Sequence, residues 1–329
     1  MQILKRDSHI YLINIEWEEN AMIKYYNTVN NIVVEENAPE DGSWISVIAP
    51  TEREINYIIN TFELDAGFVR SSLDEEESSR IENEDDQTLI IVDYAVAEVD
   101  TMGKAVLFYT LPMGIIITKK NVITISIKDN NIIDELSSGM IKNINTNFKT
   151  RFVLQLLFRI ATRFLTYLKQ IDKLTTFTEK QLHATMKNQE LIQLLDLGKA
   201  LVYFSTSLKA DQSTLNRLFK SHNIRLYEED RDLLEDVLIE VKQAIEMSQI
   251  YSQIVNGMTE GIGAIINNNM NTVIRKLTVI TILLAIPTII FSFYGMNVEH
   301  LPLVGHPIYS ILFAFAGTGI VAFFLKRNN

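Results

Sequence analysis

The chain has 329 residues, of which 47% are hydrophobic, and a formal net charge of −11 at pH 7. This length supports a sizeable core and more than one domain. An acidic protein lacks the basic face that general nucleic-acid binding requires, so we expect no nucleic-acid partner. The absence of cysteine excludes disulfides, thiolate zinc sites and cysteine nucleophiles.

The charge is distributed unevenly along the chain. Residues 1–100 contain 23 acids and 6 bases, a net charge of −17, which leaves the other 229 residues at +6. The first 17 residues, MQILKRDSHIYLINIEW, have neither a long apolar core nor a small-residue cleavage site. We therefore expect no secretory signal and a cytosolic N-terminus.

Residues 1–134 predict an acidic cytosolic α/β domain. Short runs rich in Ile, Val and Tyr between polar turns are typical of strands. Thr51 with Glu54 three residues later forms a capping-box pattern before an apolar-periodic helix. The last two strands are expected to form a hairpin around Lys119 and Lys120. The expected strands are residues 11–17, 43–50, 88–94, 105–110, 113–118 and 121–127.

Residues 135–276 predict a cytosolic helical stalk. Apolar residues recur at helical spacing over 151–174 and again over 188–208. A third periodic segment runs from Tyr227 to Tyr294 with Pro287 as its one interior proline. As a single helix, this segment would be about 100 Å long.

Two uncharged stretches near the C-terminus are long enough to cross a membrane. They predict a first transmembrane helix at 277–295, an extracytoplasmic loop at 296–306, a second transmembrane helix at 307–325 and a tail at 326–329. A buried helix of a soluble core is the alternative, but the flanking charges weigh against it. Arg275 and Lys276 precede the first stretch, Lys326 and Arg327 follow the second, and the loop has no Lys or Arg. The positive-inside rule then gives a multi-pass protein of the cell (inner) membrane, in contact with the lipid bilayer, with both termini cytoplasmic.

A line of small and polar side chains follows one face of the long helix, and we call it the polar stripe. Thr and Ser that bond back to their own helix explain single members. A continuous line within an arc of about 80–100° fits better with a water-compatible tube. Two spans cannot enclose such a tube alone, so transport would need several copies, with apolar constrictions at Ile274 and Leu277. The stripe comprises Asn256, Glu260, Gly263, Asn267, Asn271, Ile274, Thr278, Thr281, Ala285, Thr288, Ser292 and Gly295.

The sequence Tyr294-Gly295-Met296-Asn297, at the outer end of the first of two C-terminal spans, resembles the signature of the CorA family of divalent-cation transporters. The resemblance extends to the whole layout, from the acidic α/β domain through the long helix to the basic tail. It implies a multi-domain α+β membrane protein that forms a funnel-shaped homopentamer, with the first span lining the pore. It also implies passive, potential-driven influx of hydrated Mg²⁺, and of Co²⁺ or Ni²⁺, with Mg²⁺ as both the transported and the regulatory ion and no organic cofactor.

The resemblance also assigns roles to residues. Gly295, Met296 and Asn297 would form the outer selectivity filter, in which neutral amides accept hydrogen bonds from the waters of Mg²⁺. Glu299 either raises the local cation concentration or is an ordinary loop charge. Pore-facing positions would be Asn271, Ile274, Leu277 and Thr288, and the helical projection adds Thr278, Thr281, Ala285 and Ser292.

Family members are gated by cytosolic Mg²⁺ bound between an acid of the N-terminal domain and an acid on the long helix of a neighbouring subunit. Asp236 stands at the matching distance before the Gly295 motif. Its partner is open, because Arg70-Ser71 occupies the place of an acidic pair. Asp74, or another acid of the run 73–86, could take that role, although such a run is usually a solvated surface.

Two alternatives remain for the function. A ZntB-like zinc transporter shares the scaffold and the motif, and a non-conducting membrane scaffold or sensor could keep the fold. An enzyme is not expected, because the chain has no P-loop, no GxGxxG after a strand, no HExxH and no GxSxG.

Overall fold

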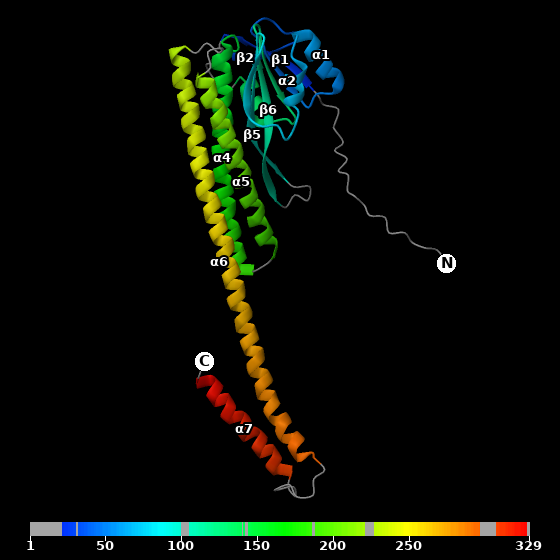
Figure 1. Cartoon of the computed structure of the whole chain (residues 1–329), viewed down its shortest axis with the longest axis vertical. Coiled ribbons are helices and arrows are strands. Elements are labelled where there is room, and N and C mark those ends of the chain that lie inside the picture. Colours follow the sequence, from blue (N-terminus) through cyan, green and yellow to red (C-terminus); the bar gives the residue numbers. More distant parts are fainter. Residues whose placement is uncertain are drawn as a thin grey trace, which may run out of the picture. The chain divides into compact units, whose positions relative to one another are not determined.

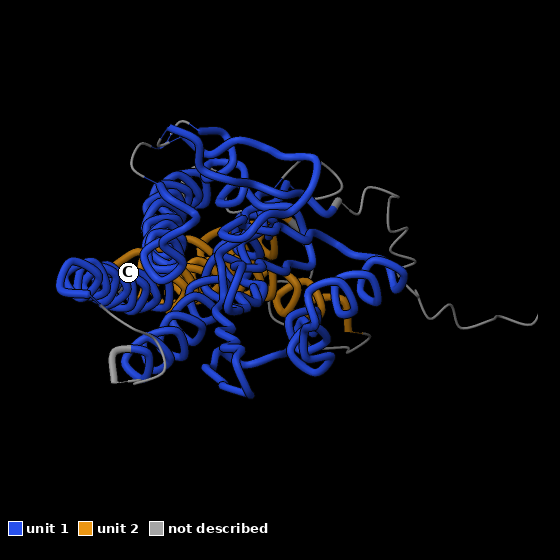
Figure 2. Tube along the Cα trace, turned by 90° about the horizontal axis from the view of Figure 1, so that it is seen from above, with its two compact units in different colours: residues 1–256 blue, residues 257–329 orange. Residues whose placement is uncertain are grey.

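The computed structural model describes residues 22–30, 32–99, 105–139, 141, 144–185, 188–220, 227–296 and 307–327. The chain divides into two compact units, residues 1–256 and 257–329 (Figure 2). The long helix α6 (Glu228–Tyr294) passes from the first unit into the second, which confirms one continuous 67-residue helix. The strand expected at 11–17 lies outside the described residues.

The first unit is built on a seven-stranded mixed sheet with the order β2-β1-β3-β7-β6-β5-β4. The β3–β7 pair is parallel and the other neighbours are antiparallel. The expected hairpin around Lys119 and Lys120 is confirmed as the β6–β7 connection. The strands are β1 (Met22–Val29), β2 (Ile32–Glu36), β3 (Trp44–Ile48), β4 (Arg80–Glu84), β5 (Gln87–Val99), β6 (Val106–Ile117) and β7 (Val122–Ser126).

The structure corrects the strand prediction in three places, one of which is β4, a strand inside the acidic run 73–86 that was not expected. The segments expected as separate strands at 105–110 and 113–118 form the single strand β6, which pairs with β5 along its length. Pro112 is tolerated inside β6 because β7 pairs only from Met113 onward, so no neighbour on that side requires a donor from residue 112. In addition, β1 and β2 form a hairpin that the apolar pattern did not predict; Asn30 at its turn has a left-handed φ of 53°.

Both faces of the sheet are covered, so its central strands are apolar on both sides. On one face α1 (Glu52–Phe62) and α2 (Ala66–Ser71) enclose a core that includes Leu89 and Ile91. On the other face the alternate residues Ile90, Val92 and Tyr94 join a larger core under the stalk helices (Figure 1). The predicted capping box of α1 is confirmed: Thr51 accepts from the Glu54 amide while the Glu54 carboxylate accepts from the Thr51 amide.

Three helices complete the larger core, in addition to the short helix α3 (Asn131–Ser137). They are α4 (Lys149–Thr185), α5 (Asn188–Lys220) and the part of α6 up to Asn256. Their contact rows are apolar at helical spacing, as in Phe204, Leu208, Leu215 and Leu218 of α5. The aromatic rings of Phe164 and Phe204 meet edge-to-face, with centroids 5.1 Å apart.

The second unit holds the remainder of α6 and the helix α7 (Pro307–Arg327), which lies along it. Each of these helices is long and apolar enough to cross a membrane. The face that α7 turns toward α6 is made of small residues, including the buried Ala314 and the half-buried Gly317 and Thr318. A Cβ at Gly317 would lie 3.1 Å from Cγ2 of Ile286, so glycine permits this close approach of the two helices.

Candidate functional site

The predicted pore residues lie on the part of α6 that belongs to the second unit. From Leu277 to Met296, the half-buried side chains fall on a single face of the helix. That face consists of Val279, Leu283, Ile286, Pro287, Ile290 and Tyr294. It is the face on which α7 packs, since Gly317 of α7 lies against Ile286 and Ile290.

The polar stripe lies on the opposite side of the helix, roughly 170° away at 100° per residue. In the single chain, the side chains of the stripe from Asn271 to Ser292 are all exposed, and so is Leu277 at the margin of the stripe. Thus α7 covers one face of α6 and leaves the stripe open. The members concerned are Asn271, Ile274, Thr278, Thr281, Ala285, Thr288 and Ser292.

The threonine hydroxyls of the stripe donate to carbonyls one turn earlier on α6. Thr278 donates to Ile274, Thr281 to Leu277 and Thr288 to Leu284, each with an oxygen–oxygen distance of 2.9 Å. A hydroxyl whose proton is engaged in this way still has lone pairs to accept hydrogen bonds. The exposed side of the stripe therefore presents acceptors, which suits the polarised waters around a cation.

The Gly295-Met296-Asn297 motif, the predicted filter, begins where α6 ends. The Gly295 amide donates to the Phe291 carbonyl at 2.9 Å, and the Met296 amide donates to Phe293 at 3.4 Å, so the last turn tightens before the chain leaves the helix. A Cβ at residue 295 would lie 3.1 Å from the Phe291 oxygen. Asn297 and Glu299 lie outside the described residues.

The two acids expected to sense Mg²⁺ lie in the first unit. Asp236 is exposed on α6, and Asp74 is exposed in the turn after α2, where its carboxylate accepts from the Glu76 amide at 3.1 Å. Within the described part of the chain, no group of three or more His, Asp or Glu side chains could hold a metal ion. The regulatory role of these acids therefore stays a prediction.

Sequence reasoning missed a buried acid in the first unit. Asp211 of α5 is 3% exposed, and its Oδ1 accepts from the Ser79 hydroxyl at 2.8 Å and from the Asp93 amide at 3.0 Å. Burial, and then the nearby Asp93 carboxylate, raise the pKa of Asp211 well above its ordinary value, and burial also raises the pKa of Asp93. The signal was present in the sequence, because Asp211 occupies an apolar position of the α5 repeat between Leu208 and Leu215.

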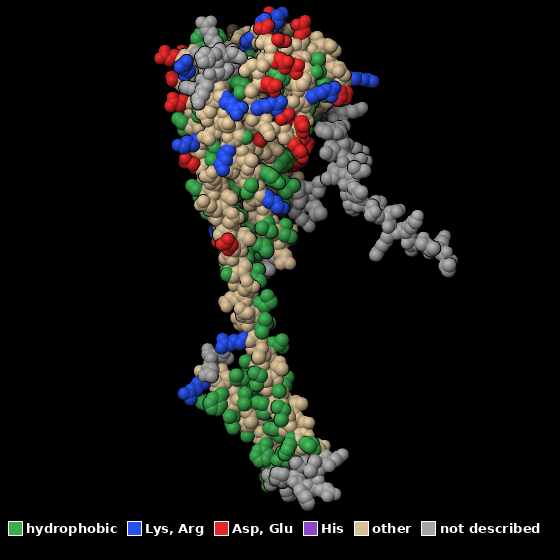
Figure 3. Space-filling view, viewed as in Figure 1, with side chains coloured by type: hydrophobic (Ala, Val, Ile, Leu, Met, Phe, Trp, Pro, Cys, Tyr) green, Lys and Arg blue, Asp and Glu red, His purple; other side chains and the backbone are tan. Residues whose placement is uncertain are grey.

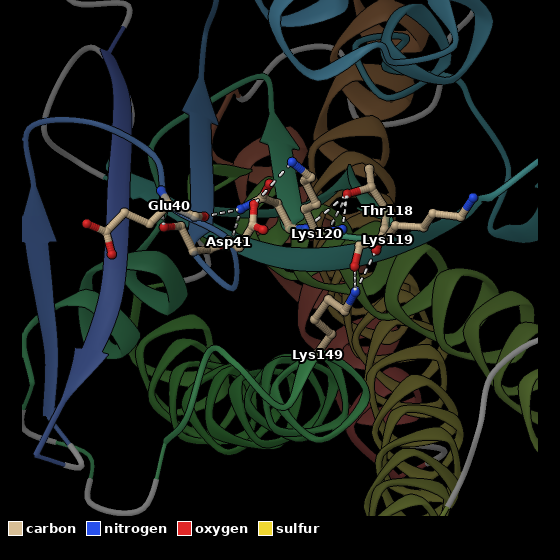
Figure 4. Close-up of polar contacts among 8 residues, drawn as sticks. Glu40, Asp41, Thr118, Lys119, Lys120 and Lys149 are labelled. Carbon is tan, nitrogen blue, oxygen red and sulfur yellow. Dashed lines mark hydrogen bonds and ion pairs between the residues drawn. The ribbon is translucent and has the colours of Figure 1, made fainter.

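A second missed feature is the lysine that joins α4 to the β6–β7 hairpin (Figure 4). Lys149, the first residue of α4, donates from Nζ to the Thr118 carbonyl at 2.8 Å and also to the Lys119 carbonyl. Burial lowers the pKa of Lys149. The same hairpin is tied to the loop before β3, where the Asn121 amide group donates to the Glu40 carbonyl at 2.7 Å.

We expect Lys149→Met to destabilise the first unit by about 1–2 kcal/mol, because it removes hydrogen bonds from a charged donor. Thermal unfolding of the purified protein would measure this as a lower Tm. Lys180→Met on the same helix serves as the control, since the Lys180 side chain is exposed. Equal Tm values for the two variants would contradict the prediction.

Residues 39–327 match the sequence model of the family described as CorA-like Mg²⁺ transporter protein. The chain belongs to the CorA family. The cobalt/magnesium transport protein CorA of Methanocaldococcus jannaschii is 28% identical over 274 residues, which cover 80% of this chain and 82% of that protein. CorA membership confirms an ion transporter rather than an enzyme.

Comparison with solved structures confirms the CorA fold. The complete structure of the CorA magnesium transporter from M. jannaschii matches with a TM-score of 0.75 at 22% identity, over 93% of this chain and 96% of that one. The cytoplasmic domain of ZntB from Vibrio parahaemolyticus matches with a TM-score of 0.57 at 13% identity, over 75% of this chain and 99% of that domain. The α/β domain, the helical stalk and the long helix followed by a second apolar helix are thereby confirmed. The domain boundaries and pore residues given above stay predictions.

Proposed function

We propose that this chain is a CorA-type channel that carries hydrated Mg²⁺, and also Co²⁺ or Ni²⁺, passively into the cell. The observation that carries the proposal is the polar stripe of α6, which α7 leaves open on the opposite face. The printed name of the M. jannaschii relative, a cobalt/magnesium transport protein, supports the choice of ions.

A homopentamer is the proposed working form, because one stripe cannot enclose a pore. Five copies of α6 with their stripes inward would give a bore lined by Thr, Ser and Ala and without a fixed charge inside the membrane. Each α7 would then lie outside α6, toward lipid. Both termini would face the cytoplasm, since Arg275, Lys276, Lys326 and Arg327 flank the spans on that side.

The chemistry of the bore and of Asn297 suits Mg²⁺, which keeps several of its waters. Hydroxyl lone pairs and amide oxygens accept hydrogen bonds from coordinated water without binding the metal directly. A ring of neutral amides also releases a divalent ion more readily than a ring of carboxylates would. An inside-negative potential draws a divalent cation inward by about 4.6 kcal/mol per 100 mV.

A liposome flux assay tests the proposal. Purified protein, verified as a pentamer, would be reconstituted with an inside-negative potential, and uptake of Mg²⁺, Co²⁺, Ni²⁺ and Zn²⁺ compared. Uptake of Mg²⁺ supports the proposal, and a strong preference for Zn²⁺ would favour a ZntB-like transporter instead. No uptake of any divalent ion would leave the non-conducting scaffold or sensor.

We propose further that cytosolic Mg²⁺ closes the channel through Asp236, with Asp74 or a nearby acid of a neighbouring subunit as its partner. In the wild type, Mg²⁺ would then protect the protein against limited proteolysis. Asp236→Ala is expected to shift this protection to at least tenfold higher Mg²⁺, whereas Asp232→Ala, an exposed acid one turn earlier, should leave it unchanged. Unaltered protection in Asp236→Ala would exclude this gating site.

A further inference from the structure

A groove lies on α6 just before the apolar part of the helix. It has a volume of about 430 Å³ and is lined by Thr272, Arg275, Lys276, Val279 and Ile280, which we call the basic groove. The spacing of three and four residues places all five side chains on one face of the helix. Its polar and basic members precede its apolar members along the helix axis.

The basic groove continues the face on which α7 packs. Gly317 of α7 lies against Ile286 and Ile290, and the two helices run in opposite directions (Figure 1). Lys326 lies nine residues after Gly317 on α7, and Val279 lies a similar number of residues before Ile286 and Ile290 on α6. Because both helices rise equally per residue, Lys326 is at about the level of Val279. Figure 3 shows Lys and Arg side chains from both helices at this end of the apolar pair.

These cations have no acidic counterpart nearby in the sequence. Between residues 261 and 329 the chain contains a single acid, Glu299, which follows the opposite end of α6. Arg275 and Lys276 thus line a groove whose other end, at Val279 and Ile280, is apolar, and Ile280 is 54% exposed. A ligand that joins an anionic group to an apolar chain would therefore complement the groove.

We propose that the basic groove binds an anionic phospholipid, with its phosphate at Arg275 and Lys276 and an acyl chain along Val279 and Ile280. Basic clusters at the ends of transmembrane helices attract anionic headgroups, and apolar surface beside them accepts the chain. Lys326 and Arg327 supply further positive charge from α7. The assignment to the cytoplasmic leaflet rests on the orientation given under the proposed function, while the binding itself does not.

Fluorescence quenching tests the site. Both native tryptophans, Trp17 and Trp44, lie in the N-terminal region, so a tryptophan introduced by Ile280→Trp reports on the groove. The full-length variant would be reconstituted into vesicles of phosphatidylcholine mixed with phosphatidylglycerol, with brominated chains on one lipid or the other. We expect brominated phosphatidylglycerol to compete several-fold better than brominated phosphatidylcholine at this position.

Phe291→Trp is the matched control, because residue 291 lies on the same face of α6 three turns further on and is exposed. It should show no preference between the two lipids. Adding Arg275→Gln and Lys276→Gln to Ile280→Trp should bring the preference down to about the level of Phe291→Trp, because the basic side chains attract the anionic headgroup. Adding Lys326→Gln and Arg327→Gln should give a smaller reduction, and this second pair tests the site if the first pair fails to fold.

Equal quenching by both lipids at residue 280 would overturn the proposal, as would a preference that survives removal of Arg275 and Lys276. If a neighbouring subunit filled the groove, both lipids would quench equally at residue 280. Because the assay measures binding and not transport, loss of ion flux with the lipid preference intact would count against the proposed function alone.

Discussion

Replacing Thr281 by leucine is expected to lower Mg²⁺ flux at least tenfold. Thr281 lies in the middle of the polar stripe, and its hydroxyl donates to the Leu277 carbonyl, which leaves its lone pairs directed outward. In an assembled pore, several leucines at one level would remove the acceptors and form an apolar constriction that excludes water. Uptake by proteoliposomes loaded with a Mg²⁺-sensitive dye would measure the effect.

Two further variants separate a pore role from a general packing role. Thr281→Ser keeps the hydroxyl and should retain most of the flux. Ile282→Leu changes the adjacent residue, outside the stripe, and should conduct like the wild type. If Thr281→Leu conducts normally in a verified pentamer, the stripe does not line the pore.

The second large effect concerns stability and the buried carboxyl of Asp211. Around it, α4 contributes Leu157, Ile160 and Phe164, and α6 contributes Val241. Among the described residues, the carboxylate that raises its pKa by charge is Asp93 of β5. A carboxyl whose pKa is raised by folding contributes stability below its unfolded pKa, near 3.8, and that contribution is lost as the pH rises through the higher folded pKa. The free energy of unfolding of the wild type should therefore fall as the pH increases across this range.

Asp211→Asn removes the titration and keeps an oxygen that can accept from Ser79 and from the Asp93 amide. We expect this variant to unfold a few degrees above the wild type at pH 8, with a weaker dependence on pH. Asp211→Ala leaves both donors without their acceptor, at about 1–3 kcal/mol each, and should lower the Tm. Thermal unfolding from pH 5 to 9 measures both variants, and a lower Tm for Asp211→Asn at pH 8 would contradict the prediction.

Much of this fold could be predicted because it depends on local pattern. The capping box of Thr51 and Glu54, the β6–β7 hairpin and the unbroken α6 all follow from residues close together in the sequence. The polar stripe is equally local, since helical geometry alone aligns residues three and four apart. The family signature at Gly295 to Asn297 is also local.

The features that sequence reasoning missed depend on contacts between distant residues. Lys149 meets the carbonyl of Thr118, 31 residues away, and Asp211 accepts from Ser79, 132 residues away. β6 continues through Pro112 because β5 pairs with it on one side, while β7 on the other side pairs only from Met113 onward. No short sequence window contains such information.

The amino-acid sequence by itself determined that this chain has two apolar helices, a long helix with one small and polar face, and an acidic α/β domain. Each of these follows from periodicity and charge, which act over one or two helical turns or a single strand. Only the tertiary structure decided that α7 covers the face of α6 opposite the polar stripe. That choice is made by the fit of Gly317 and Ala314 against Ile286 and Ile290, because helices associate where small residues allow close packing.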